Sequence, residues 1–225
     1  MLIGTTSPAV GRRLHPLAVR IMHWVNAAAM IMMILSGIGI YNDEAIFGWL
    51  YFPKWLLLGS WAADHLLWHF AAMWLLVVNG LLYLLYGLVT GRFRERLLPI
   101  SVRGAISDVR DALHLKLAHA DLTVYNSVQK LLYIAVILIG VVQVCSGLAI
   151  WKPVQFAGLT ALFGSFQGAR LAHFLGMASI VGFLVVHVGL ALLVPRTLVA
   201  MVTGGPRVPT HGNRQTLQSS LQARE

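Results

Sequence analysis

Cysteine is nearly absent from this 225-residue sequence, which contains only Cys145. A single thiol leaves no partner for a disulfide within the chain, and it cannot build a zinc site from several cysteines. Metal binding by this chain therefore depends on other residue types.

Acidic residues are also scarce, with 8 Asp and Glu against 17 Lys and Arg. Cation transporters and proton pumps usually carry carboxylates within the membrane, and the acidic residues here are not placed that way. They occupy connections, span ends or the C-terminal tail: Asp43, Glu44, Asp64, Glu95, Asp108, Asp111, Asp121 and Glu225.

Apolar residues make up 58% of the chain and charged residues only 11%, far from the balance of soluble domains. A helix needs roughly 20 apolar residues to cross the hydrocarbon core. Four stretches are long enough, at about 19–41, 61–90, 127–151 and 171–195. The sequence predicts an all-α membrane protein, a bundle of four transmembrane helices.

Basic residues predict the orientation of this bundle. Only Lys54, Lys152 and Arg170 of the 17 Lys and Arg residues lie in the connections around 42–60 and 152–170. The positive-inside rule then places both termini in the cytoplasm, and the basic balance needs no role for nucleic acid.

Two segments outside the spans complete the predicted organisation. The connection 91–126 mixes apolar and basic residues and is a candidate interfacial helix. Residues 1–203 are expected to form the membrane domain, and 204–225 a mobile cytoplasmic tail.

Two histidines, His173 and His187, lie fourteen residues apart in the fourth apolar stretch. Fourteen residues rise about 21 Å along an α-helix and return to nearly the same side. These imidazoles therefore lie at different depths, where they cannot bind one metal ion together but can serve two centres stacked across the membrane.

Each centre needs a second ligand from another helix at the same depth. His23, near the inner end of the first span, matches His187, and His69, in the outer half of the second span, matches His173. Bis-imidazole ligation at two levels is what two b-type haems require. With one cysteine the C-x-x-C-H attachment motif is excluded, so both haems would be non-covalent.

Two alternatives stay open for these histidines. A membrane histidine often forms only an interhelical hydrogen bond. His65 lies four residues before His69 on the same helix face and is its main rival as a ligand. The remaining histidines are expected to be interfacial or in the tail: His15, His114, His119 and His211.

The two halves of the chain also echo each other. "LSGIGIYND" closes the first span and "CSGLAIWKP" closes the third, while "HFAAMWLLVVNG" and "HFLGMASIVGF" begin within the second and fourth. The echo suggests that each half is one helical hairpin of a duplicated pair.

The strings "RIMHW", "VNA" and "WHF", together with the fourth-span histidine pair, resemble the bacterial transmembrane cytochrome b561 family. This family includes cytochrome b subunits of nickel-iron hydrogenases, formate dehydrogenases and thiosulfate reductases. Thiosulfate-reductase-type subunits are the most similar, through "HPLAVRIMHW", "WHFAAMWLLVVNG" and "SGLAIWKPVQF". The resemblance covers about residues 15–200.

The resemblance implies a bundle with two b haems, and it carries the axial-ligand role to His23, His69, His173 and His187. It further implies electron transfer between a periplasm-facing partner, in this group often molybdopterin-dependent, and the quinone pool. "YNSVQK" is similar to a segment beside the quinone site of formate dehydrogenase cytochromes. By that likeness Asn126 and Gln129 become candidates for a quinone oxygen, with capping and interface polarity at a helix start as the alternative. Arg20 and Lys130, near the inner surface, are candidates for haem propionates, with positive-inside charge placement as the alternative.

The predicted function is that of a di-haem b electron-transfer subunit anchored in the bacterial inner membrane. Its substrate chemistry would belong to another chain, so no catalytic residue is expected here. One alternative is a stand-alone enzyme that oxidises a small reductant such as superoxide and reduces quinone. The other is a haem-free transporter or scaffold whose histidines form interhelical hydrogen bonds.

Overall fold

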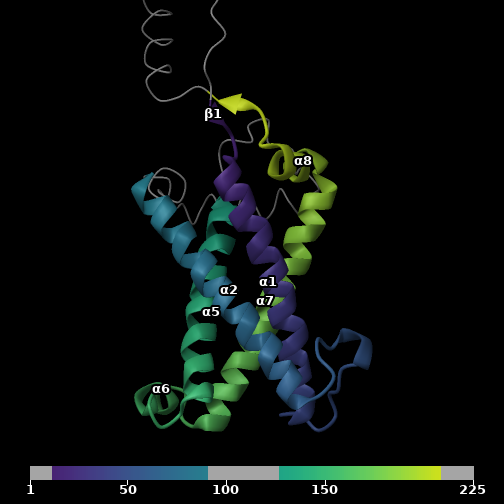
Figure 1. Ribbon diagram of the computed structural model, residues 1–225, viewed down its shortest axis with the longest axis vertical. Coiled ribbons are helices and arrows are strands. Elements are labelled where there is room, and N and C mark those ends of the chain that lie inside the picture. Colours follow the sequence, from purple (N-terminus) through teal and green to yellow (C-terminus); the bar gives the residue numbers. More distant parts are fainter. Residues whose placement is uncertain (1–11, 91–126, 209–225) are drawn as a thin grey trace, which may run out of the picture.

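The computed structural model describes residues 12–90 and 127–208 and forms a bundle of four long helices (Figure 1). They are α1 (Leu17–Asp43), α2 (Ala62–Val89), α5 (Ser127–Trp151) and α7 (Phe166–Leu193). All four are long and apolar enough to cross a membrane. The predicted all-α membrane fold is confirmed.

The bounds of the fourth span differ from the prediction of 171–195. Helix α7 begins five residues earlier because Ser165 caps it, its Oγ accepting the Gly168 N–H at 3.0 Å. It ends at Leu193, and Pro195 instead occupies the first turn of a separate helix, α8 (Pro195–Thr203). Proline suits a first turn because it has no N–H to leave unpaired.

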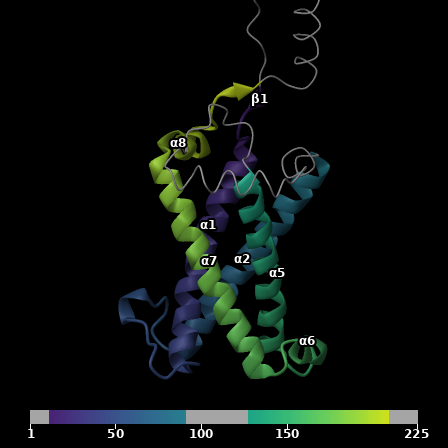
Figure 2. The same cartoon turned by 180° about the vertical axis from the view of Figure 1, so that it is seen from behind.

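Short elements mark the two ends of the bundle (Figures 1 and 2). One end, called the terminal end here, holds α8 and the antiparallel pair of β1 (Arg12–Arg13) with β2 (Arg207–Val208). The other, the loop end, holds the connections 44–61 and 152–165 with η1 (Lys54–Leu56) and α6 (Ala157–Leu162). Both ends of the described chain thus meet at the terminal end, as four spans require.

The long helices form two hairpins, α1 with α2 and α5 with α7, and close backbone approach between long helices occurs within each hairpin. Side chains connect the hairpins near the loop end. Tyr41 stacks on Phe174 with ring centroids 4.7 Å apart, and Phe70 packs against Trp151 at 5.2 Å.

A polar contact joins α1 to α2 in the other half of the bundle. Asn79 is buried and its Nδ2 donates to Met22 O at 2.8 Å and to Asn26 Oδ1 at 2.7 Å. Because no water competes for such groups in lipid, this contact fixes how the two helices pack.

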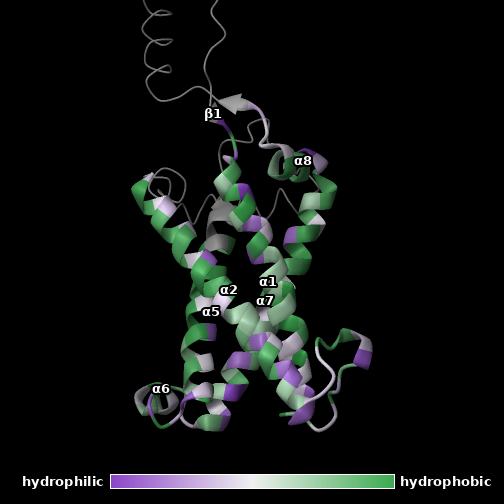
Figure 3. Ribbon diagram, in the orientation of Figure 1, coloured by the Kyte–Doolittle hydropathy of each residue, from purple (hydrophilic) through white to green (hydrophobic). Residues whose placement is uncertain are grey.

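Hydrophobic residues predominate along the four long helices (Figure 3). On α2, for example, Leu81, Leu85 and Leu88 are 61%, 59% and 72% exposed. An apolar exterior around buried polar contacts is the pattern expected of helices that face lipid.

Two predicted segments fall wholly or partly outside the described residues. The candidate interfacial helix in 91–126 lies outside them, as does 209–225 of the predicted tail. Residues 204–208 of the predicted tail are described and end in β2.

Candidate cofactor site: two histidine pairs

The structure brings together both histidine pairs expected from helix depth. His69 of α2 faces His173 of α7 with ring centroids 6.3 Å apart, and we call these two the loop-end pair. His23 of α1 faces His187 of α7 at 6.2 Å, and these are the terminal-end pair. Helix α7 contributes to both because its two histidines share one side.

A serine of the neighbouring helix holds His69. Ser36 is fully buried in α1, and its Oγ lies 2.7 Å from Met32 O and 3.0 Å from His69 Nδ1. A hydroxyl has one proton, which the shorter contact gives to the carbonyl. Oγ therefore accepts from Nδ1–H, and His69 Nε2 keeps its lone pair for another ligand.

The second hairpin repeats this arrangement at His173. Ser146, also fully buried, places Oγ 2.6 Å from Val142 O and 3.0 Å from His173 Nδ1. Both imidazoles of the loop-end pair are thus held in the same tautomer by a serine in the partner helix of their own hairpin. This is how outer hydrogen bonds orient metal-binding histidines.

Glycines next to these serines allow the close approach of the rings. A Cβ added at Gly37 would lie 3.4 Å from His69 Cε1, and one at Gly147 would lie 3.2 Å from His173 Cε1. The Ser-Gly dipeptide of each half therefore provides both a hydrogen bond and the space for one imidazole.

The terminal-end pair has aromatic neighbours instead. Trp24 meets His23 edge-on at 5.4 Å, and Phe183 stacks on His187 at 5.6 Å with 16° between the ring planes. Among the described residues no hydrogen bond to either imidazole is found. The contact of Asn79 with Met22 O lies one residue before His23 and fixes the backbone there.

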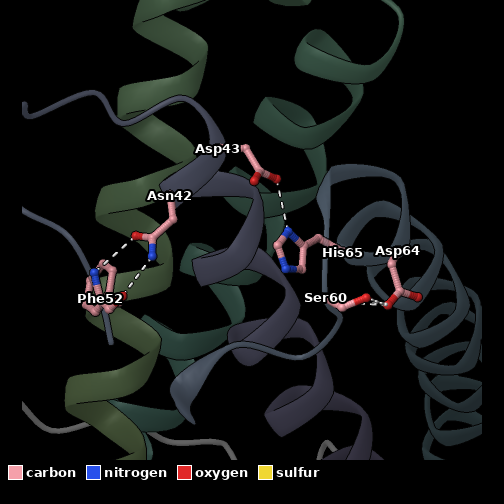
Figure 4. Close-up of polar contacts among 6 residues, drawn as sticks. All are labelled: Asn42, Asp43, Phe52, Ser60, Asp64 and His65. Atoms are coloured by element: carbon pink, nitrogen blue, oxygen red, sulfur yellow. Dashed lines mark hydrogen bonds and ion pairs between the residues drawn. The ribbon is translucent and has the colours of Figure 1, made fainter. Parts of the chain in front are cut away.

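His65, the rival of His69, occupies a different environment. It is 3% exposed, and its Nδ1 lies 2.9 Å from Asp43 Oδ2 at the end of α1 (Figure 4). His69 faces another histidine, whereas His65 faces a carboxylate. The geometry therefore favours His69 over His65 as a member of a ligand pair.

Arg20 is the remaining candidate whose side chain the structure describes, and it lies at the terminal end. Arg20 donates through Nε to Met201 O at 3.3 Å and through Nη2 to Val202 O, so its guanidinium binds the last turn of α8. Gln129 and Lys130 belong to the first turn of α5, and their side chains lie outside the described residues, as does all of Asn126.

Each histidine pair offers two nitrogen ligands, which suits a metal centre that needs only two ligands from the protein. In the described part of the chain, no three or more His, Cys, Asp or Glu side chains come together as a metal site would require. A haem iron takes four nitrogens from its macrocycle and one imidazole on each face. A coordinating imidazole nitrogen lies about 2 Å from a metal, and the centre of its ring lies about 1 Å further away. Two imidazoles on opposite faces of a haem iron therefore have ring centroids about 6 Å apart.

The observed centroid distances of 6.2 and 6.3 Å agree with this expected distance. At the loop-end pair the serine contacts also leave Nε2 available on both rings. The residues present therefore fit haem b at both levels.

Sequence reasoning missed Ser36, Ser146 and Asn79. The repeated Ser-Gly in "LSGIG" and "CSGLA" was the available signal for the two serines, since it places them in equivalent positions of both halves. For Asn79 the signal was an amide within an apolar span, which requires a partner in lipid.

Comparison with known proteins yields a family and one relative. The family model described as prokaryotic cytochrome b561 matches residues 14–204. A protein of Azospira oryzae, "Putative protein-methionine-sulfoxide reductase subunit YedZ1", is 44% identical over 191 residues, covering 85% of this chain and 96% of that protein. No solved structure matches the chain.

Proposed function

This chain belongs to the prokaryotic cytochrome b561 family, and on that premise we propose that it is a di-haem subunit linking the quinone pool to a periplasmic oxidoreductase. Family membership and the four apolar helices make it a multi-pass membrane protein that binds haem b and transfers electrons. The number of haems, the quinone, the partner and the inner membrane belong to the proposal.

The observation that carries the proposal is the stacking of two histidine pairs along α7. His69 and His173 would hold one haem, and His23 and His187 the other. Because His173 and His187 lie about 21 Å apart along one helix, haems held at these two levels would together span much of the apolar thickness. That arrangement suits electron transfer from one side of the membrane to the other.

Haem b supplies one-electron redox chemistry when bound, and the residues of this chain set the conditions. Ser36 and Ser146 fix the loop-end imidazoles and strengthen them as donors by accepting Nδ1–H. Trp24 and Phe183 pack the terminal-end imidazoles in apolar surroundings.

Charge supports the predicted orientation. The described residues of the terminal end include Arg12, Arg13, Arg20 and Arg196 and no acidic residue, whereas Asp43, Glu44 and Asp64 accompany the cations of the loop end. The terminal end would therefore face the cytoplasm and the loop end the periplasm. Quinone would then be bound beside the terminal-end haem, with Asn126 and Gln129 as candidates and Arg20 and Lys130 near the propionates.

The name of the Azospira relative supports a reductase as the partner. Quinol oxidation releases two electrons and two protons, and reduction of a methionine sulfoxide to the thioether and water consumes two of each. Electrons would pass from quinol through the terminal-end and loop-end haems to a periplasmic subunit that carries out this or a similar reduction.

The experiment that tests the proposal is a pyridine haemochrome assay on the detergent-purified chain, combined with a dithionite-reduced minus oxidised spectrum. Two haems b per chain are expected. Quinol added to the oxidised protein should then reduce both haems. One haem per chain, or rapid reduction by superoxide without reduction by quinol, would contradict it.

A further inference from the structure

An open groove of about 490 Å³ runs along the outside of α1 at the terminal end. Its walls are one face of α1 from Leu17 to Ala28, together with Val202 of α8. Three apolar side chains in this wall, Leu17, Ile21 and Trp24, are 63%, 54% and 45% exposed. The groove therefore has room for a ligand with a long apolar part.

The length of the groove matches one leaflet of a bilayer. From Leu17 to Ala28 the helix rises about 16 Å, and the hydrocarbon core of a bilayer is about 30 Å thick. Because α1 begins with Leu17 at the terminal end, the groove extends from that surface to about the middle of the membrane. An acyl chain of a lipid in this leaflet covers the same depth.

Arg20 is the charged residue in the wall of the groove, and it lies near the end of the groove at the membrane surface. Its Nε and Nη2 donate to the carbonyls of Met201 and Val202 in α8. Its Nη1 has no hydrogen-bond partner within residues 12–90 and 127–208. A permanent cation with N–H groups to spare thus stands above an apolar wall.

Helix α8 places this cation at the level of the lipid head groups. It begins at Pro195 and runs at an angle to α7 (Figures 1 and 2). Leu198, Val199 and Val202 of α8 are 36%, 56% and 52% exposed. A short helix with an exposed apolar side lies in the membrane interface, with that side toward the acyl chains.

We propose that this groove binds one anionic phospholipid, with the lipid phosphate at Arg20 and an acyl chain along α1 toward Ala28. A phosphate forms charge-assisted hydrogen bonds with a guanidinium, and the described residues of the terminal end include no acidic side chain that would repel it. Arg20 then contacts a lipid phosphate in place of the haem propionate considered above.

The acyl chain would also touch the surroundings of a terminal-end imidazole. Trp24 lines the groove, and its ring meets that of His23 edge-on with the centroids 5.4 Å apart. A bound lipid therefore supports the aromatic side chain that packs His23. Lipid binding here requires neither a quinone nor a partner subunit.

Native mass spectrometry of the detergent-purified holoprotein tests the proposal, with phosphatidylglycerol and phosphatidylcholine of identical acyl chains as probes. Wild-type protein should retain one phosphatidylglycerol at a concentration at which phosphatidylcholine is lost. Arg20→Gln should lower the affinity for phosphatidylglycerol about fivefold, the effect of one basic residue at an anionic membrane surface. Arg196→Gln removes a charge of the same end outside the groove, so this matched control should change nothing.

A second variant fills the groove without changing its charge. Ala28 is exposed at the deep end of the groove, and the phenyl ring of Ala28→Phe would occupy the space of the acyl chain. Retention of phosphatidylglycerol should fall, whereas Ala71→Phe, at an exposed position of α2 outside the groove, should leave it unchanged. If Arg20→Gln fails to accumulate because α8 detaches, this pair carries the test.

Equal retention of the two lipids by wild-type protein, or an equal loss in Arg20→Gln and Arg196→Gln, would overturn the proposal. Displacement of the lipid by glycerol phosphate would assign the site to a free anion, and displacement by decylubiquinone would assign the groove to a quinone. Loss of haem in Arg20→Gln with unchanged lipid retention would return Arg20 to a haem propionate.

Discussion

The loop-end and terminal-end pairs have nearly the same ring separation, 6.3 and 6.2 Å, but different surroundings. Both loop-end imidazoles are fixed through Nδ1 by a buried serine and have a glycine against the ring. The terminal-end imidazoles are packed by Trp24 and Phe183. Equal spacing with unequal support would make the two proposed haem sites electronically distinct.

The difference lies in how firmly each imidazole is oriented. A ring held by a hydrogen bond through Nδ1 keeps one tautomer and one direction. Aromatic packing leaves the nitrogens of the terminal-end rings less constrained, in apolar surroundings. The predictions below test this comparison.

Replacing a paired histidine should give the largest effect. His69→Ala or His173→Ala should abolish loop-end haem binding and leave one haem per chain, because a bis-imidazole site loses one axial ligand. His23→Ala or His187→Ala should remove the other haem. Pyridine haemochrome analysis and low-spin EPR signals measure this, and His211→Ala in the tail should keep both haems. Loss of the same EPR signal in all four variants would refute two separate sites.

Removing a serine should weaken only the loop-end site. Ser36→Ala or Ser146→Ala is expected to lower haem affinity there by about 10–100-fold, since outer hydrogen bonds to metal-binding histidines have effects of that size. Haem transfer to apomyoglobin measures the loss. Ser179→Ala is the matched control, because among the described residues the Ser179 hydroxyl donates to the carbonyl of Leu175 in its own helix. Faster loss of the terminal-end haem in Ser36→Ala would contradict the assignment.

Asn79→Leu should have a moderate effect, a loss of stability of the folded protein. It removes two hydrogen bonds between α2 and α1 and is expected to lower the free energy of unfolding by about 1–2 kcal/mol. Thermal unfolding in detergent should show the terminal-end haem released first, because Met22 adjoins His23. Val78→Leu alters an adjacent side chain that is 54% exposed and should change nothing.

Gly147→Ala should have the smallest effect. The new Cβ would lie 3.2 Å from His173 Cε1, so the ring must move by a few tenths of an ångström. A small change in the loop-end EPR signal is expected, and Gly140→Ala, whose Cβ meets nothing within 4 Å, should show none. Identical spectra for both variants would mean that Gly147 does not set the ring position.

The spans and the pairing of the histidines could be predicted because lipid imposes simple rules. A helix must cross about 30 Å of hydrocarbon, and the depth of a residue follows from its position along that helix. These rules give α1, α2, α5 and α7 and the partners of His173 and His187. They do not give the start of α7, which depends on the cap at Ser165, or α8, which depends on Pro195.

The hydrogen bonds that hold the imidazoles could not be predicted, because they form between side chains of different helices. A serine in an apolar span usually bonds the carbonyl four residues back, and Ser36 and Ser146 do so as well. Their second contact depends on how each hairpin packs. His65 and His69 share one helix face, so only the position of Asp43 at the end of another helix separates them.

A potentiometric titration of the purified chain, followed by the haem absorbance, tests the central claim most directly. Wild-type protein should show two one-electron components, and the double variant Ser36→Ala, Ser146→Ala should move one of them to higher potential because its imidazoles become weaker donors. The second component should stay in place. A single component in the wild type, or an equal shift of both in the variant, would contradict two distinct haem sites.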